Sequence, residues 1–261
     1  MDKLPAYEGY LLFGGQPEPA AAKNICGWLA EKCGGAEQKE DGWYHLTAYD
    51  ADVIWDAPEA FAQQRIPDFN RGQFWNIKNA NGLLAGCSHM VRLQAVSKQG
   101  TDYKQHGKML VQLIEAALQV YPSCAAVYTP ASGRLVTAEQ VQGNPARGGD
   151  RFLYLCVNTR FFSISGTNSD MMMDTVGLHL LGLPDVQYHF HSIDPNKLMK
   201  HAYSVASLLY TMGAMMRDEE TIDGMDEGGI TREIRWKFQY EHALIEPPRI
   251  VMAIQPGEYA I

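Results

Sequence analysis

The chain has 261 residues, 46% of them apolar and 20% charged, which suits a packed globular protein and disfavours bulk disorder or a membrane-embedded class. The formal net charge of −8, without any block of Lys or Arg, repels phosphate backbones and anionic lipids, so we expect neither nucleic acid nor a membrane as partner. Five scattered cysteines without a CxxC pair argue against a disulfide framework, and no secretory signal is visible, so we expect a cytoplasmic protein.

The first part of the chain alternates extended and helical patterns. An apolar run at Tyr7–Phe13 predicts a strand, and residues 20–33 predict a helix that Gly34 ends. A second clear strand covers His89–Val96, and a long helix is expected from Asp102 to Tyr121, where Pro122 stops it. A strand at 125–129 and a short capped helix from Thr137 continue the alternation.

Residues 57–81, which we call the excursion, interrupt this alternation. They contain two prolines and several aromatic residues with little periodicity, which indicates a partly helical segment ending in a loop. Aromatic and Arg side chains dominate the hot spots of protein interfaces. The interaction residues that we predict here are Phe61, Arg65, Phe69, Arg71, Phe74 and Trp75. The competing interpretation is a loop that folds onto its own core.

The most linker-like stretch is Asn-Pro-Ala-Arg-Gly-Gly at 144–149, which predicts an N-terminal half at 1–143 and a C-terminal half at 150–261, packed as one unit. The second half opens with an apolar run at 152–165 that is typical of a buried strand. The run 172–183 is open between a strand and a short helix that begins at Asp174 and ends at Gly182.

The end of the chain is easier to interpret. Asp194 followed by Pro195 begins a helix whose apolar stripe reaches Met212, and Gly213 ends it. Alternation over 234–241 predicts a half-exposed antiparallel strand, followed by a strand at 249–255. We therefore predict an α+β fold with mixed, mainly antiparallel sheets and helices packed on one face. Two similar ferredoxin-like halves are one arrangement that the pattern allows.

A family resemblance rests on the second half. The residues that carry it are 175–178 (Thr-Val-Gly-Leu), 181–186 (Leu-Gly-Leu-Pro-Asp-Val), the long helix, 221–224 (Thr-Ile-Asp-Gly) and the alternating strand. This succession resembles the bacterial family called domain of unknown function 4261. The resemblance implies a bacterial cytoplasmic protein and makes binding, immunity or regulation more plausible than catalysis, but it implies no cofactor and no site residue.

The candidates for a metal site are few. His189 and His191 flank Phe190 in an extended segment, so both imidazoles leave one strand face and could share a metal ion. Two ligands are too few, and a third would have to come from His179 or Asp194. We therefore interpret His189 and His191 as polar residues near a strand end, and we predict no metal and no cofactor.

No local motif identifies a nucleophile, because the chain has no GxSxG and no spacing that singles out one cysteine. The leading hypothesis is a non-enzymatic protein-binding, immunity-like or regulatory module. The alternative is a small-molecule hydrolase or other enzyme whose site, with or without a metal, assembles only in space. The partner, the substrate and the oligomeric state are not encoded in any local pattern.

Overall fold

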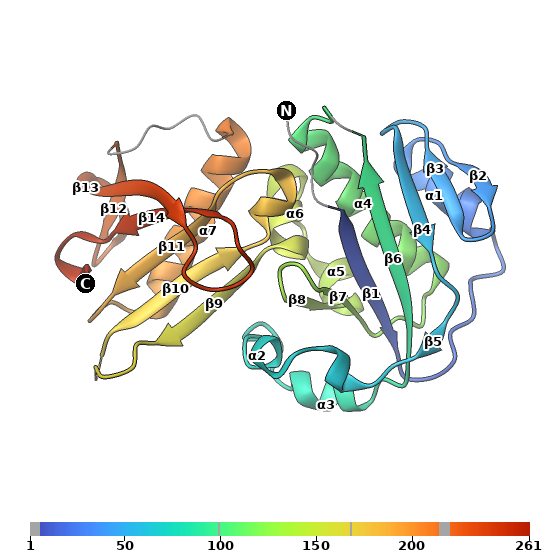
Figure 1. The fold of residues 1–261 in the computed structure, drawn as a ribbon, viewed down its shortest axis with the longest axis horizontal. Helices are drawn as coiled ribbons and strands as arrows, with labels where there is room; N and C mark the ends of the chain where they lie inside the picture. Colours follow the sequence, from blue (N-terminus) through green and yellow to red (C-terminus); the bar gives the residue numbers. More distant parts are fainter. Residues whose placement is uncertain (1–5, 99, 168, 214–219) are drawn as a thin grey trace. The chain divides into compact units, whose positions relative to one another are not determined.

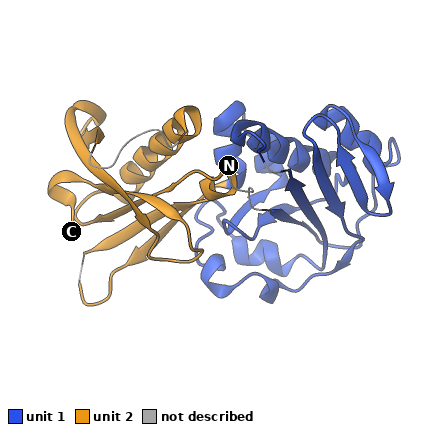
Figure 2. Ribbon diagram, turned by 45° about the horizontal axis from the view of Figure 1, so that its top comes forward, with its two compact units in different colours: residues 1–156 blue, residues 157–261 orange. Residues whose placement is uncertain are grey.

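The computed structural model describes residues 6–98, 100–167, 169–213 and 220–261. The chain divides into two compact units, residues 1–156 and residues 157–261 (Figure 2). The boundary lies later than the predicted linker at 144–149, because residues 148–156 form a helix that belongs to unit 1. Within the described residues, no helix is both long and apolar enough to cross a membrane.

Unit 1 is built on an eight-stranded sheet (Figure 1). Its strands are β1 (Tyr7–Phe13), β2 (Glu37–Glu40), β3 (Trp43–Leu46), β4 (Ala51–Trp55), β5 (Glu59–Ala60), β6 (His89–Ser97), β7 (Ala126–Thr129) and β8 (Arg134–Thr137). Its helices are α1 (Ile25–Cys33), α2 (Asp68–Arg71), α3 (Ala80–Ala85), α4 (Tyr103–Val120), α5 (Ala138–Gly143) and α6 (Gly148–Cys156). The sheet order is β2-β3-β4-β6-β1-β7-β8, with β5 paired to β6, and every pairing is antiparallel.

The core of unit 1 has a recognisable topology. The elements β1, α1, β4, β6, α4 and β7 follow one another in the order βαββαβ, and their strands lie in the order β4-β6-β1-β7. This is the split-βαβ arrangement of ferredoxin-like folds. The strands β2 and β3 extend the sheet at one edge, and β8 extends it at the other.

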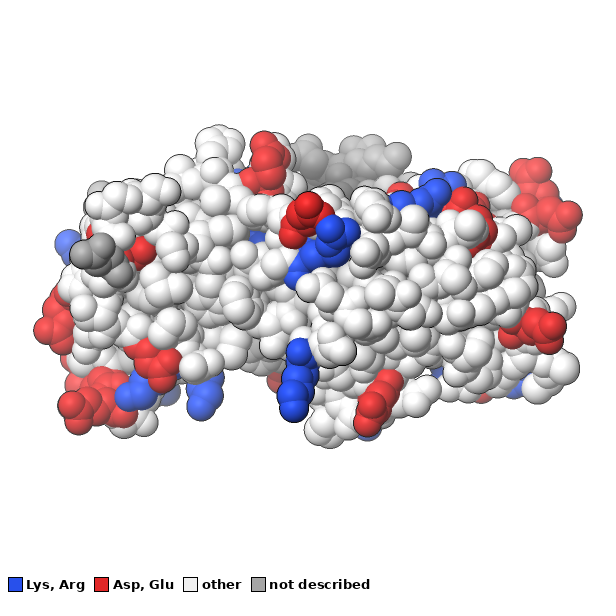
Figure 3. Space-filling model, turned by 90° about the horizontal axis from the view of Figure 1, so that it is seen from below, with Lys and Arg blue, Asp and Glu red and all other residues white. Residues whose placement is uncertain are grey.

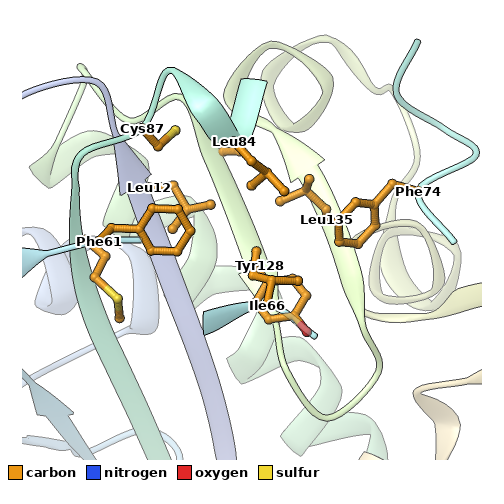
Figure 4. Close-up of a cluster of buried hydrophobic side chains, with 10 residues drawn as sticks. Leu12, Phe61, Ile66, Phe74, Leu84, Cys87, Tyr128 and Leu135 are labelled. Atoms are coloured by element: carbon orange, nitrogen blue, oxygen red, sulfur yellow. The ribbon is translucent and has the colours of Figure 1, made fainter. Parts of the chain in front are cut away.

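Alternate residues of β1 point to opposite faces of the sheet, as the pleat of a strand requires, and different elements cover the two faces. Phe13 contacts Tyr121, which follows α4, with ring centroids 5.4 Å apart. The helices α1 and α6 both pack against α4, so these three helices lie on one side of the sheet. Leu12 points to the opposite side, where the excursion and α3 cover the sheet with a buried apolar cluster (Figure 4).

Unit 2 contains a six-stranded sheet in the order β12-β13-β14-β11-β10-β9. Its strands are β9 (Asn158–Ser163), β10 (Met171–Val176), β11 (Asp185–Phe190), β12 (Thr221–Asp226), β13 (Gly229–His242) and β14 (Ile250–Gln255). Only β11 and β14 pair in parallel among these strands. The long helix α7 (Pro195–Met212) follows β11, and a 3₁₀ turn η2 (Leu178–Leu181) follows β10.

The two units therefore do not share one topology, although both confirm the α+β class with mainly antiparallel sheets. The βαββαβ order of unit 1 has no counterpart in unit 2, where α7 is the one α-helix among the described residues. A hydrogen bond of 2.7 Å joins the Tyr188 hydroxyl of β11 to the ring of His201 on α7, which places α7 over that face of the sheet.

Several predicted elements are confirmed. The Asp102 side chain caps α4, the Asp194 side chain caps α7, and Thr137 forms a capping box with Gln140 at the start of α5. The apolar run at 152–165 is not one strand, since its first five residues belong to α6 and only 158–163 are extended. The open run at 172–183 is strand β10 followed by η2, which Gly182 ends in the left-handed conformation.

Candidate functional site

The excursion is held down by apolar side chains that enter the core of unit 1. Phe61, Ile66 and Phe74 lie in the buried cluster with Leu12 of β1 and Tyr128 of β7 (Figure 4). Tyr128 also accepts a hydrogen bond of 2.7 Å from the Asn70 side-chain amide. These contacts fix the backbone of the excursion on the sheet, so its outward-facing side chains project from an anchored backbone.

The four aromatic residues among the six predicted interaction residues separate into two groups. Phe61 and Phe74 are 7% and 5% exposed and belong to the core. Phe69 and Trp75 are 46% and 63% exposed, and the Trp75 indole N–H donates to Gln73 Oε1 at 2.8 Å.

The two arginines of this set are paired within the excursion. Arg65 donates to the Glu59 carboxylate at 2.7 Å, and its side chain is 44% exposed. Arg71 forms an ion pair with Asp68 and donates to the carbonyl oxygen of Gln63 at 2.9 Å. A hollow of about 520 Å³ beside Arg71 is lined in part by Gln63, Asp68 and Arg71.

The histidines that we considered as metal ligands are not gathered. His189 lies on β11 with its Nε2 atom buried and without a hydrogen-bond partner, whereas the His191 ring contacts the Ser192 hydroxyl at 3.1 Å. Of the two possible third ligands, His179 contacts Asp185 at 3.1 Å and Asp194 caps α7. Across the described part of the chain, no three His, Cys, Asp or Glu side chains converge as a metal would require.

Unit 2 instead holds a buried ionic network that sequence reasoning missed. Asp174 on β10 is fully buried, and Arg160 on β9 binds it with two parallel hydrogen bonds of 2.9 and 2.5 Å. Arg249 donates to the same carboxylate at 2.7 Å. The signal in the sequence was the presence of charged residues inside runs that otherwise read as apolar strands.

Asp185 is the second carboxylate of this network. Its oxygens accept hydrogen bonds from the Thr175 hydroxyl and from the backbone N–H groups of residues 177–179, and Arg249 Nε lies 3.3 Å away. Burial alone would raise the pKa of Asp185, but the hydrogen bond from His179 and the charges of His179 and Arg249 outweigh it, so the pKa lies below its usual value.

The same network fastens the connection between β13 and β14. Arg160 donates to the carbonyl oxygen of Glu246 at 2.7 Å, and Arg249 donates to those of Ile245 and Pro247 at 2.8 and 2.9 Å. The Asp174 carboxylate is bound by two guanidinium groups and the Asp185 carboxylate largely by backbone N–H groups, and both are closed to solvent. This arrangement suits a structural clamp better than an exposed acid or base.

A groove on unit 2 lies between α7 and the β12–β13 hairpin and has a volume of about 550 Å³. His201 lies at its base, where Tyr188 donates to Nδ1 and Nε2 donates to the carbonyl oxygen of Asp223, each at 2.7 Å. Burial lowers the pKa of His201, so the imidazole is neutral at pH 7. Because both ring nitrogens are engaged inside the protein, His201 has no nitrogen ready to act as a general base.

The family comparison concerns the segment that contains these features of unit 2. Residues 174–255 match the family described as domain of unknown function (DUF4261). Searches among curated proteins and among solved structures gave no match. The DUF4261 segment begins at Asp174 and includes Asp185, Arg249 and α7, while Arg160 lies before it. The resemblance noticed in the sequence is thereby confirmed, and the DUF4261 description carries no activity.

Proposed function

We propose that this chain is a non-enzymatic protein-binding or regulatory module of the bacterial cytoplasm, and that its partner contacts Arg65, Phe69, Arg71 and Trp75. The observation that carries this proposal is the exposure of Phe69 and Trp75 on a segment anchored through Phe74. Large aromatic side chains on a firm base lose little conformational entropy on binding, which makes them effective interface anchors.

The charge distribution supports a protein partner. On the side of unit 1 where α2 and α3 lie, charged side chains are sparse and separated by wide uncharged areas (Figure 3). Protein interfaces are depleted of charge in their centre and enriched in aromatic residues and Arg. The formal net charge of −8 disfavours a nucleic-acid partner.

The ionisable side chains support binding rather than covalent chemistry. Burial raises the pKa of the Cys33, Cys124 and Cys156 thiols to about 12, so these sulfurs are protonated at neutral pH and poor nucleophiles. The described cysteines are all free, which suits a reducing compartment.

The test is affinity capture from the organism that encodes this chain, with the full chain as bait. We expect a stoichiometric partner, and we expect Phe69→Ala and Trp75→Ala each to weaken its binding by about thirtyfold, as hot-spot residues do. Trp43→Ala is the matched control, because Trp43 is another exposed tryptophan of unit 1, at 42% exposure, outside the excursion. Failure to recover a partner, or equal recovery by all four baits, would contradict the proposal.

A further inference from the structure

The two ring nitrogens of His179 have different environments. His179 lies in η2, the 3₁₀ turn that follows β10, and its side chain is 17% exposed. Its Nδ1 contacts the Asp185 carboxylate at 3.1 Å. Its Nε2 has no hydrogen-bond partner among the described residues and, unlike Nε2 of His106 and His189, is not closed off from solvent. One nitrogen is therefore held by the protein, and the other is open.

The carboxylate that holds Nδ1 is itself fixed. Asp185 is fully buried, and its oxygens accept hydrogen bonds from the backbone N–H groups of residues 177–179. Burial opposes its ionisation, but the hydrogen bond from His179 and the charge of Arg249 hold the pKa of Asp185 below the usual value. An ionised carboxylate can only accept a hydrogen bond, so Nδ1 of the neutral imidazole carries the proton and Nε2 keeps its lone pair.

A carboxylate against a ring nitrogen is uncommon in this chain. Among the described residues, only His45 and His179 have such an ion-pair contact. His45 is a close comparison, because its side chain is 20% exposed and its Nδ1 lies 2.9 Å from Asp52. Its surroundings differ, however, since Asp52 is half exposed and Nε2 of His45 faces a second carboxylate, that of Asp50, at 3.6 Å. His179 is thus the described histidine that combines a buried carboxylate on Nδ1 with an open Nε2.

The charge behind His179 is balanced. Asp185 lies 3.3 Å from Arg249 Nε, and the buried network to which both belong contains two arginines and two carboxylates. This network adds no net negative charge behind the imidazole, whereas two carboxylates flank His45. An anionic reagent can therefore approach Nε2 of His179 without the repulsion that it would meet at His45.

Two kinds of reaction are open to an imidazole held in this way. It can take a proton from a bound substrate, or it can attack an electrophile through Nε2. The first needs a pocket for the substrate, and His179 lines neither the groove beside α7 nor the hollow beside Arg71. The second needs only a small reagent from solution. When Nε2 forms a bond the ring becomes cationic, and the buried carboxylate of Asp185 stabilises that charge as it develops.

The electrophile that suits this position is a phosphoryl group. Small phosphoryl donors are compact and anionic, so they need no pocket and favour Nε2 of His179 over that of His45. A phosphoryl group on imidazole persists in neutral water, whereas an acyl group is hydrolysed quickly, so only the phosphoryl group makes a lasting modification. We propose that His179 accepts a phosphoryl group at Nε2 from small donors of the acyl phosphate or phosphoramidate class. This site lies in unit 2 and does not depend on the partner surface proposed for unit 1.

The transfer needs no further reactant. The lone pair of Nε2 attacks phosphorus, and an N–P bond forms while the bond from phosphorus to the leaving group breaks. The leaving group departs with the electrons of that bond, as a carboxylate from an acyl phosphate or as ammonia from N-protonated phosphoramidate. The Nδ1 proton stays in place, so the product is a phosphorylated imidazolium paired with Asp185. The added group brings negative charge and acceptor oxygens to the surface of unit 2, which are the means by which phosphorylation alters binding.

The test exposes the full chain to potassium phosphoramidate and, in a second arm, to acetyl phosphate, and follows each histidine peptide by mass spectrometry in alkaline buffer, which preserves the N–P bond. In both arms we expect His179 to be phosphorylated at least about tenfold faster than any other histidine, because the charge-assisted hydrogen bond to Asp185 lowers its barrier. Phosphorus NMR should place the group on Nε2. His179→Gln should abolish the fast reaction, and His45→Gln, the matched control, should leave it unchanged.

Two further comparisons separate the role of Asp185 from the reactivity of any exposed imidazole. Asp185→Asn should slow the labelling of His179 about tenfold, with hydrogen–deuterium exchange of peptides from residues 157–261 to show whether unit 2 is folded. Unfolding the unmodified chain in concentrated urea needs no variant and should bring the rate at His179 down to that of the other histidines.

Four results would overturn the proposal. These are equal rates at His45 and His179 in the folded chain, an unchanged rate at His179 in urea, attachment of the phosphoryl group at Nδ1, and fast modification of His179 by diethyl pyrocarbonate without fast phosphorylation. The last result would make His179 a nucleophile for acyl groups alone.

Discussion

Arg160 and Asp174 face each other across β9 and β10 and share two hydrogen bonds of 2.9 and 2.5 Å in a region closed to water. Their partner Arg249 reaches the same carboxylate from the far end of the β13–β14 connection. The charge of the Asp174 carboxylate is therefore balanced by arginine side chains alone, without water to screen it.

We expect Asp174→Ala to destabilise unit 2 by about 3–5 kcal/mol, because it leaves two arginines buried without their shared carboxylate. Urea unfolding followed by hydrogen–deuterium exchange of peptides from residues 157–261 would measure this loss within unit 2. Arg232→Ala is the control, because Arg232 is 93% exposed and its nearest carboxylate, that of Asp223, is as far away as 3.9 Å, which makes the pairing weak. Equal unfolding midpoints for Asp174→Ala and the unmodified chain would show that the network adds no stability.

A second prediction concerns two neighbours in the excursion. Phe74→Ala should cost about 3–5 kcal/mol of unfolding free energy in unit 1, because it opens a cavity in the cluster around Tyr128. Trp75→Ala should change the unfolding free energy by only about 0.5 kcal/mol, because most of that side chain is already in water. Thermal denaturation of both variants checks the pair, and similar losses would mean that Trp75 also serves the core.

The stability of unit 1 should fall with acid through His106. Burial lowers the pKa of His106 from 6.5 to about 4, while its Nδ1 contacts the Ser97 hydroxyl at 2.7 Å and its Nε2 is buried without a partner. Between these two pH values His106 is therefore protonated in the unfolded chain and neutral in the folded chain. Between pH 6.5 and 4 the unfolding free energy should drop by about 3 kcal/mol and then level off.

Urea titrations at several pH values would test this dependence on His106. His106→Gln removes the titrating group and should flatten the slope for unit 1 in that window. An unchanged slope in His106→Gln would assign the acid sensitivity to other groups, among them His201 in unit 2, whose pKa is also lowered by burial.

The cysteines should differ in reactivity. Cys26 is partly exposed, whereas the other four are buried, and burial raises the pKa of three of them to about 12. Iodoacetamide needs both access to the sulfur and a thiolate, and burial denies access to the other four cysteines, so it should modify the partly exposed Cys26 first. Peptide mapping by mass spectrometry checks the order, with Cys26→Ser as the control that loses the rapid label. Rapid native labelling of Cys124 would contradict it.

Local sequence signals predicted the elements that are stabilised mainly by interactions between residues close together in the chain. The capping residues Asp102 and Asp194 and the apolar stripes that follow them determined α4 and α7, because a helix satisfies its own backbone and needs only one buried face. The prediction of a strand at 152–156 was wrong, because a short apolar run fits a buried helix as well as a buried strand.

What the sequence determined by itself was the α+β class, the principal helices and strands, and the presence of aromatic residues and Arg in the excursion. Only the tertiary structure decided that Phe74 is core while Trp75 is exposed, and that Arg160, Asp174 and Arg249 meet although 89 residues separate the first from the last. The reason is that burial and charge pairing depend on which strands lie side by side, and strand order is set by contacts among residues far apart in the chain.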